Sequence, residues 1–207
     1  MPNTYMNPLE AIHHLRKVDP RFISLIDIHG PPNLHRTRNS FKSLVHTVIY
    51  QQLSGKVASI IYKRFINLFP TRHFPTPKKV RQLSIEKLQT AGLSRRKATT
   101  IHEISDQYIH GHVRPHRFNY MSAAEITDML TKVKGIGPWT ASIFLMFALN
   151  YPDILPTSDL GIRKGIQKLC NLSHLPEHKT ILQIAEPWKP FRTTASWYLW
   201  RHLDTKP

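Results

Sequence analysis

The sequence predicts an all-α protein, an irregular bundle of helices rather than a solenoid. Apolar residues recur at helical spacing in several segments, and proline or glycine interrupts the chain between these segments. No segment shows sustained strand-like alternation, and no fixed-period repeat is present. The 207 residues are enough for one domain, or one compact pair of subdomains, with a core that needs no disulfides.

The helices expected in the first half of the chain begin at proline or at polar residues. Pro8 suits the first turn of a helix through residue 17, because its missing N–H has no partner to lose there. For the same reason, the pair Asp19-Pro20 predicts the start of a second helix that continues to about residue 28. A loop rich in glycine and proline follows over 29–38. The further helices expected in this half cover about 40–50, 56–69, 84–91 and 95–110, with a break at 51–55.

The second half contains a tight turn between two helices. Ser122 and Glu125 form a capping box that predicts a helix to residue 132. A turn at 135–137 precedes a helix to about residue 149, and a proline-rich loop continues to residue 158. The last helices are expected over about 159–170 and 190–202.

Composition indicates an intracellular protein with a polyanionic partner. Lys and Arg number 29 against 13 Asp and Glu, so the net charge is +16, which favours nucleic acid over an anionic membrane surface. No strongly basic amphipathic helix and no membrane-spanning stretch stands out, so we expect no membrane partner. Cys170 is the sole cysteine and is expected to pack between helices in a reducing compartment. The first residues lack a signal-peptide pattern, so we expect the cytoplasm or nucleoid of a bacterium or the nucleus of a eukaryote.

The turn after the capping box is suited to phosphate. Residues 130–146 read L-T-K-V-K-G-I-G-P-W-T-A-S-I-F-L-M. Gly135 and Gly137 allow a left-handed turn and a close approach of another backbone, and free N–H groups then face outward at a helix N-terminus. Lys132 and Lys134 flank the turn. A G-x-G-P sequence alone fits any turn between packed helices, whereas the whole pattern is far more specific.

That whole pattern resembles the hairpin of the HhH-GPD superfamily of DNA glycosylases. Other motifs follow in the order of that family: Q-Q-L-S within 44–65, T-S-D at 157–159 and A-S-W-Y-L-W-R at 195–201 resemble the compact 3-methyladenine glycosylases. The resemblance covers roughly 40–202. It implies one glycosylase unit over 1–207, made of two closely packed helical subdomains with the active-site cleft between them. The helix-hairpin-helix would cover about 122–149, and the loop with the catalytic aspartate about 150–161.

Asp159 occupies the position of the essential aspartate in this family. Taken alone, an aspartate before an apolar helix is an ordinary N-cap. Cleavage of an N-glycosidic bond develops positive charge on the sugar, and a fixed carboxylate stabilises that charge or directs the attacking water. The resemblance therefore implies that Asp159 is the catalytic residue of a hydrolase that acts in base excision repair. The sequence leaves the two roles of the carboxylate open.

The resemblance also implies an alkylated base and no strand cleavage. Bifunctional relatives carry a lysine where this chain has Trp139, so Schiff-base chemistry and lyase activity are not expected. Trp139, Trp200 and Tyr50 would line the base pocket, where aromatic faces attract electron-poor rings such as 3-methyladenine or 7-methylguanine. The residues expected at DNA are Gln51, Gln52, Leu53, Ser54, Lys132, Lys134, Gly135, Gly137, Thr140 and Lys164.

Gln52 is the first choice for the side chain that fills the gap left by a flipped base, and Leu53 is the second. The family usually has glycine before the two glutamines, and this chain departs from that pattern with Tyr50. No cofactor is expected to be required. The main-chain carbonyls of Thr131, Val133 and Ile136 would hold Na⁺ or K⁺ by resemblance, and one cysteine excludes an iron–sulfur cluster.

Other interpretations stay open. A non-catalytic hairpin protein that binds damaged DNA would need neither Asp159 nor pocket aromatics, and a glycosylase for uracil, a mismatched base or an oxidised base would differ in its pocket. Among the 13 histidines, neither the pair His174 and His178 nor the group at 110–116 has a Cys or acidic partner at ligand spacing, so surface or phosphate-facing positions are expected for them. The expected partner is double-stranded DNA with a damaged base, bound by a monomer.

Overall fold

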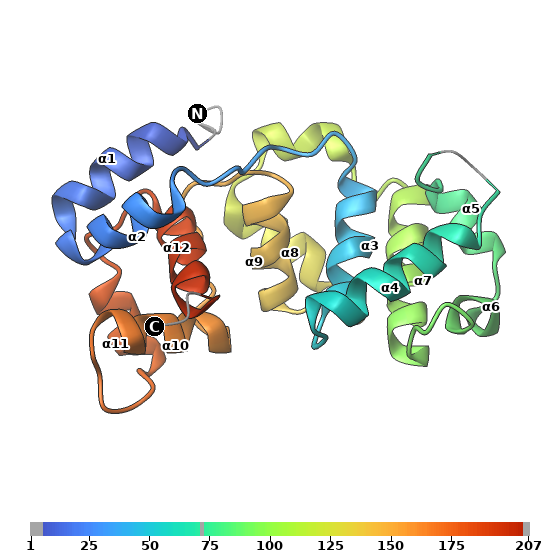
Figure 1. The fold of residues 1–207 in the computed structure, drawn as a ribbon. Coiled ribbons are helices and arrows are strands. Elements are labelled where there is room, and N and C mark those ends of the chain that lie inside the picture. Colours follow the sequence, from blue (N-terminus) through green and yellow to red (C-terminus); the bar gives the residue numbers. More distant parts are fainter. Residues whose placement is uncertain (1–5, 71–72, 205–207) are drawn as a thin grey trace. The chain divides into compact units, whose positions relative to one another are not determined.

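The protein is built from helices in two compact units (Figure 1). The computed structural model describes residues 6–70 and 73–204, and no strand occurs in these ranges. Within them, one unit comprises 37–144, and the other comprises 6–36 with 145–204. No helix in this part of the chain is long and apolar enough to cross a bilayer. The predicted all-α class is confirmed.

The first unit, called here the hairpin unit, is organised around one long helix. Its elements are α3 (Ser40–Tyr50), α4 (Gly55–Asn67), α5 (Pro77–Gln82), α6 (Ile85–Gln89), α7 (Arg95–Ile109), the 3₁₀ segment η2 (Pro115–Tyr120) and α8 (Ala123–Thr131). Helix α7 packs against α3, α5 and α6, and α4 packs against α3. Ile101 and Ile104 of α7 are completely buried, so this helix forms the centre of the core.

The second unit, called here the aspartate unit, surrounds the C-terminal helix. Its elements are α1 (Pro8–Val18), the 3₁₀ segment η1 (Pro20–Phe22), α2 (Ile23–His29), α10 (Leu160–Leu169), α11 (His178–Ile184) and α12 (Arg192–Asp204). Helix α12 packs against α10, α2 and α1. Phe22, Trp188 and Tyr198 meet edge to face in its core. Helix α9 (Pro138–Phe147) passes from the hairpin unit into this one.

Capping chemistry determines where the helices begin. The predicted capping box at Ser122 and Glu125 is present, with bonds in both directions. Asn39, Ser54 and Ser94 each accept a backbone N–H from the first turn of the following helix. These polar side chains satisfy donors that a helix start would otherwise leave without partners.

Three short elements were not predicted. They are α5, α11 and η2, each of six or seven residues. Segments this short are not stable by propensity and depend on tertiary packing, which leaves little periodic signal in the sequence. Two further predictions need adjustment. The helix expected over about 190–202 begins at Arg192, and the one expected over 84–91 is limited to Ile85–Gln89.

A buried aspartate ties the N-terminal segment to the core of the aspartate unit. Asp19 is 4% exposed and accepts hydrogen bonds from both the Arg21 guanidinium and the Trp188 indole, the latter at 2.9 Å. Burial alone would raise the pKa of Asp19, but the hydrogen bonds from Arg21 and Trp188 lower it below its usual value. The anionic form is therefore the one that the fold stabilises.

Asp19→Asn should lower the free energy of unfolding by about 1–3 kcal/mol at neutral pH, because the buried donors lose a charged acceptor. Since folding lowers the pKa of Asp19, its stabilisation is complete above the unfolded value near 3.8 and is lost as the pH falls through the lower folded value. Denaturant titrations from pH 7 to pH 2.5 should show a weaker acid dependence in the variant. Asp128→Asn, at an exposed position, is the control, and equal acid dependence in all three proteins would contradict this role.

Candidate active site and nucleic-acid interface

Asp159 is held by two N–H donors at the start of α10. Its side chain caps the helix, with Oδ1 accepting from the Ile162 amide at 2.9 Å. The same oxygen accepts from the Trp200 indole Nε1 at 2.9 Å. The structural role of an N-cap and the proposed functional role therefore both fit this residue. Its carboxylate is partly exposed and fixed in direction, as a group that acts on developing charge must be.

Trp200 reaches Asp159 because α10 and α12 approach each other closely at two glycines. A Cβ at Gly165 would lie 2.8 Å from the Cβ of Leu199, and a Cβ at Gly161 would lie 2.7 Å from Cδ1 of Trp200. The Gly161 Cβ would also lie 2.9 Å from Oδ1 of Asp159. A side chain at Gly161 would therefore displace the indole, the carboxylate or both.

The first turn of α12 also holds the loop that leads to Asp159. The Thr193 hydroxyl donates to the Tyr151 carbonyl at 2.6 Å and accepts from the Ile154 amide at 3.0 Å. The Arg192 guanidinium binds both carboxylate oxygens of Asp153, with Nη2 at 2.8 Å from Oδ2. One helix thus positions both the approach to the aspartate and the indole that binds it.

An aromatic pair lies beside the carboxylate. The ring of Phe147, at the end of α9, lies 5.8 Å from the Trp200 ring at an angle of 33°. Phe147 is 40% exposed, so part of its ring is open to solvent. Sequence reasoning selected Trp200 but missed Phe147. The only signal was its place two turns after Trp139 on an apolar helix, which does not distinguish an exposed ring from a core ring.

The predicted hairpin is present between α8 and α9. Gly135 has φ +92°, and a Cβ there would lie 1.9 Å from Oγ1 of Thr100 on α7. Only glycine fits this approach of the hairpin to α7. Lys132 and Lys134, just before Gly135, are both exposed, as expected for side chains that meet a phosphate backbone.

The loop at 51–54 is fixed from two sides. The Lys97 ammonium donates to the carbonyls of Ile49 and Gln51 at 2.8 and 2.7 Å. The Gln51 side chain donates to the hydroxyl of Thr140 at 2.7 Å. Thr140 is 2% exposed, so its hydroxyl supports this loop rather than facing solvent. Sequence reasoning missed Lys97, because nothing in its surroundings distinguishes it from a surface lysine.

The tip of the loop carries the two residues selected for insertion into DNA. Gln52 adopts a left-handed backbone with φ +54° and is exposed, and Leu53 is 38% exposed. Just before the loop, the Tyr50 ring stacks on His46 with centroids 4.0 Å apart. Burial, and to a lesser degree the nearby Lys42, lower the pKa of His46, which favours the neutral ring in this stack.

The predicted residues divide between the two units. Asp159, Trp200 and Lys164 belong to the aspartate unit, where the first two are in contact and Lys164 is exposed on α10. The remaining predicted residues belong to the hairpin unit: Tyr50, Gln51, Gln52, Leu53, Ser54, Thr131, Lys132, Val133, Lys134, Gly135, Ile136, Gly137, Trp139 and Thr140. The structure brings together Gln51 with Thr140, and the hairpin with α7.

Known proteins resemble this chain over most of its length. Residues 45–190 match the model for the HhH-GPD superfamily of base excision DNA repair proteins. The chain is 33% identical over 192 residues to DNA-3-methyladenine glycosylase 1 of Schizosaccharomyces pombe, covering 91% of this chain and 84% of that one.

Solved structures agree with these matches. The 3-methyladenine DNA glycosylase of S. pombe in complex with abasic DNA superposes with a TM-score of 0.86 at 34% identity, covering 93% of this chain and 95% of that one. A DNA-3-methyladenine glycosidase from Bacillus halodurans gives 0.80 at 32% identity, covering 99% and 94%.

Lys97→Met should release the loop at 51–54, because two carbonyls at the end of α3 lose a charged donor. We expect faster amide hydrogen exchange at 51–54 and an unfolding free energy lower by about 1–3 kcal/mol. Lys63→Met, at an exposed position on α4, removes the same charge and should change neither quantity. Unchanged exchange in Lys97→Met would show that the loop holds its conformation without the ammonium.

Proposed function

The chain belongs to the HhH-GPD superfamily of base excision DNA repair proteins, and from this premise we propose that it removes alkylated bases from DNA, with Asp159 as its catalytic carboxylate. The family predicted from the motifs is confirmed. The observation that carries the proposal is the position of Asp159, held by the Ile162 amide and by the indole of Trp200, whose ring in turn lies near the exposed ring of Phe147. The names of the relatives support alkylated bases such as 3-methyladenine as substrates.

The chemistry follows from a fixed anion. When the bond between sugar and base breaks, the sugar becomes oxocarbenium-like, and water then attacks it to leave an abasic site. Asp159 supplies negative charge where that positive charge develops, and two N–H donors prevent the carboxylate from turning away. Because it is already oriented before the reaction, little reorganisation is required as the bond breaks.

The aromatic pair supports a preference for alkylated bases. Alkylation at a ring nitrogen makes a purine electron-poor and often cationic, and aromatic faces attract such rings. We assign Phe147 and Trp200 to one wall of the base pocket, because their rings lie together beside Asp159. Tyr50 and Trp139 remain the proposed contributions of the hairpin unit. A cationic base leaves readily, so no general acid is required.

The hairpin unit supplies most of the proposed contacts to DNA. The exposed lysines at the hairpin and Lys164 on α10 would meet backbone phosphates, and the tip at Gln52 and Leu53 would enter the duplex when the base leaves it. We retain Gln52 as the first choice and Leu53 as the second. The chain would act as an intracellular monomer on double-stranded DNA.

A monovalent cation at the hairpin is proposed from family membership. The ligands would be the main-chain carbonyls of Thr131, Val133 and Ile136, which are oxygen donors suited to a hard cation. The Val133 carbonyl also accepts the Ile136 amide at 3.0 Å, and a carbonyl oxygen has a second lone pair for a cation. Such an ion would add positive charge at the surface that meets a phosphate. No other cofactor is proposed.

Asp159→Asn should reduce the single-turnover release of 3-methyladenine from duplex DNA by at least about 100-fold, because the fixed negative charge is lost. The amide can still accept the N–H bonds, so folding and DNA affinity should be retained, which thermal unfolding and DNA binding by anisotropy would check. Ser158→Ala, at the exposed neighbouring position, is the control.

The same assay tests the specificity and the reaction type. Strand nicking without added base would contradict a monofunctional enzyme and the inference from Trp139. No release of any alkylated base by the native chain would favour a glycosylase for uracil, a mismatched base or an oxidised base, or a non-catalytic damage binder. Release from those other substrates then separates these two alternatives.

Gly161→Ala should slow base release about tenfold or more, because the added methyl group displaces the Trp200 indole from Asp159. A double-mutant cycle with Trp200→Ala tests the cause. In the Trp200→Ala background the indole is absent, so the Gly161→Ala change should cost less further rate, and the cost that remains comes from the contact of the methyl group with the Asp159 carboxylate. An equal cost in both backgrounds would mean that Gly161 acts without Trp200.

A further inference from the structure

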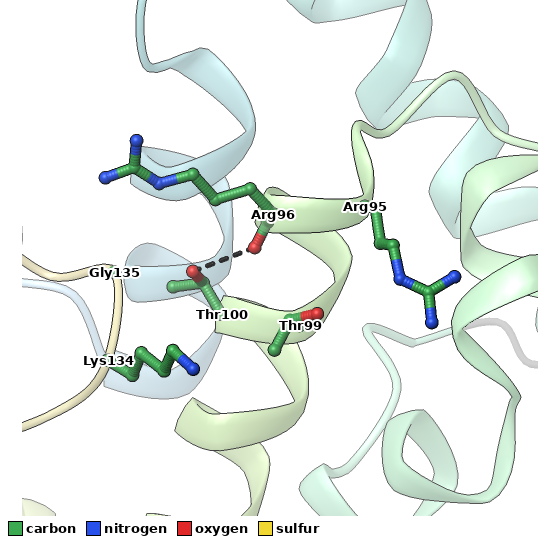
Figure 2. A pocket seen from close by; sticks show the side chains of 6 residues that line it. All are labelled: Arg95, Arg96, Thr99, Thr100, Lys134 and Gly135. Carbon is green, nitrogen blue, oxygen red and sulfur yellow. Dashed lines mark hydrogen bonds between the residues drawn. The ribbon is translucent and has the colours of Figure 1, made fainter.

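A cavity of about 530 Å³ opens where α7 begins, next to the hairpin (Figure 2). It is lined by Arg95, Arg96, Thr99, Thr100, Lys134 and Gly135, all in the hairpin unit. Its first four residues come from α7 and the last two from the hairpin. Sequence reasoning selected only the hairpin residues, because residues 95–100 are far from 134–135 along the chain.

The two walls of this cavity are held together by the close contact at Gly135. Thr100 is 3% exposed, and its hydroxyl donates to the Arg96 carbonyl at 3.0 Å (Figure 2). The hydroxyl and methyl group therefore have no freedom to move away from the Gly135 backbone. Because the contact is rigid, Lys134 stays at the same cavity as the two arginines.

The charge of the cavity is positive and largely uncompensated. Three of its six lining residues are cations, and none is a carboxylate. Arg95 approaches Glu86 at 3.5 Å, but both side chains are about 70% exposed (73% and 69%), and such pairs are weak. Among the residues that the structure describes, Arg96 and Lys134 form no ion pair with a carboxylate. A lining with three cations and no carboxylate favours an anion.

We propose that this cavity binds a DNA backbone phosphate other than the one at the hairpin amides, with Arg96 and Lys134 as its main cationic contacts. This inference rests on the proposed function. A guanidinium can bind two phosphate oxygens at once. The contact reads no base, so it would strengthen binding to damaged and undamaged duplexes alike.

Binding of an undamaged duplex as a function of salt tests this proposal. For Arg96→Gln we expect affinity about tenfold weaker at low salt, and a slope of log K against log salt that is smaller by about 0.9 for one lost phosphate contact. An abasic duplex, which carries no base to release, should lose affinity by the same factor. Thermal unfolding would show whether the variant remains folded, and Lys134→Gln should give the same pattern.

Lys79→Gln is the control, because it removes one positive charge, as Arg96→Gln does, at a position away from the cavity. Lys79 is exposed on α5, which packs against the other end of α7, as the Arg81 ion pair with Asp106 shows. That end is roughly 15 Å along the helix from Arg96. If Lys79→Gln and Arg96→Gln reduce affinity and slope equally, net charge alone explains the effect and the proposal is wrong.

Three other outcomes would overturn the inference, the proposed function or both. Native protein that binds no duplex at all overturns the proposed function together with this inference, whereas native binding with an unchanged Arg96→Gln slope overturns the inference alone. Calorimetric titration with inorganic phosphate at matched ionic strength tests whether the cavity binds a free phosphate ion instead of a DNA phosphate. Phosphate binding that Arg96→Gln abolishes, with an unchanged DNA slope, would make the cavity an anion site unrelated to DNA.

Discussion

The close packing of α10 on α12 is the contact on which the geometry of the proposed catalytic site depends. Gly161 and Gly165 leave no side chain between the helices, so the Trp200 indole reaches the Asp159 carboxylate. Tyr198 and Leu199, the residues just before Trp200, are completely buried in the core of the aspartate unit. The apolar core therefore determines the position of a polar contact. A site built on packed helices in this way is held more precisely than one built on loops.

The hairpin unit shows the same dependence of a polar surface on a close backbone contact. Gly135 brings the hairpin against Thr100, and this contact places Lys134 beside the arginines of α7. On the other side, Lys97 and Thr140 hold the loop at 51–54. In both units glycine permits the approach, a buried neighbour makes it rigid, and the side chains proposed to be functional lie next to it.

Sequence reasoning predicted the features whose signals are local. The hairpin depends on glycines two residues apart, and Asp159 follows it at the spacing of its family, so the sequence alone was enough to select both. Sequence reasoning did not select Phe147 or Lys97, because their contacts are with residues distant in the chain. Phe147 contacts Trp200, and Lys97 donates to carbonyls at the end of α3. The same reason explains why α5 and α11 were missed, since helices of six or seven residues depend on packing.

A net charge of +16 does not by itself locate a nucleic-acid surface, because many cations already have partners within the fold. Arg192 binds Asp153, Lys97 binds the end of α3, and Lys168 binds the His202 carbonyl. These charges already serve contacts within the fold. The cations that remain are the candidates for contact with DNA, and only the structure separates the two groups. Arg96 and Lys134 belong to the second group, because a rigid backbone contact holds both at one cavity with no carboxylate in its lining.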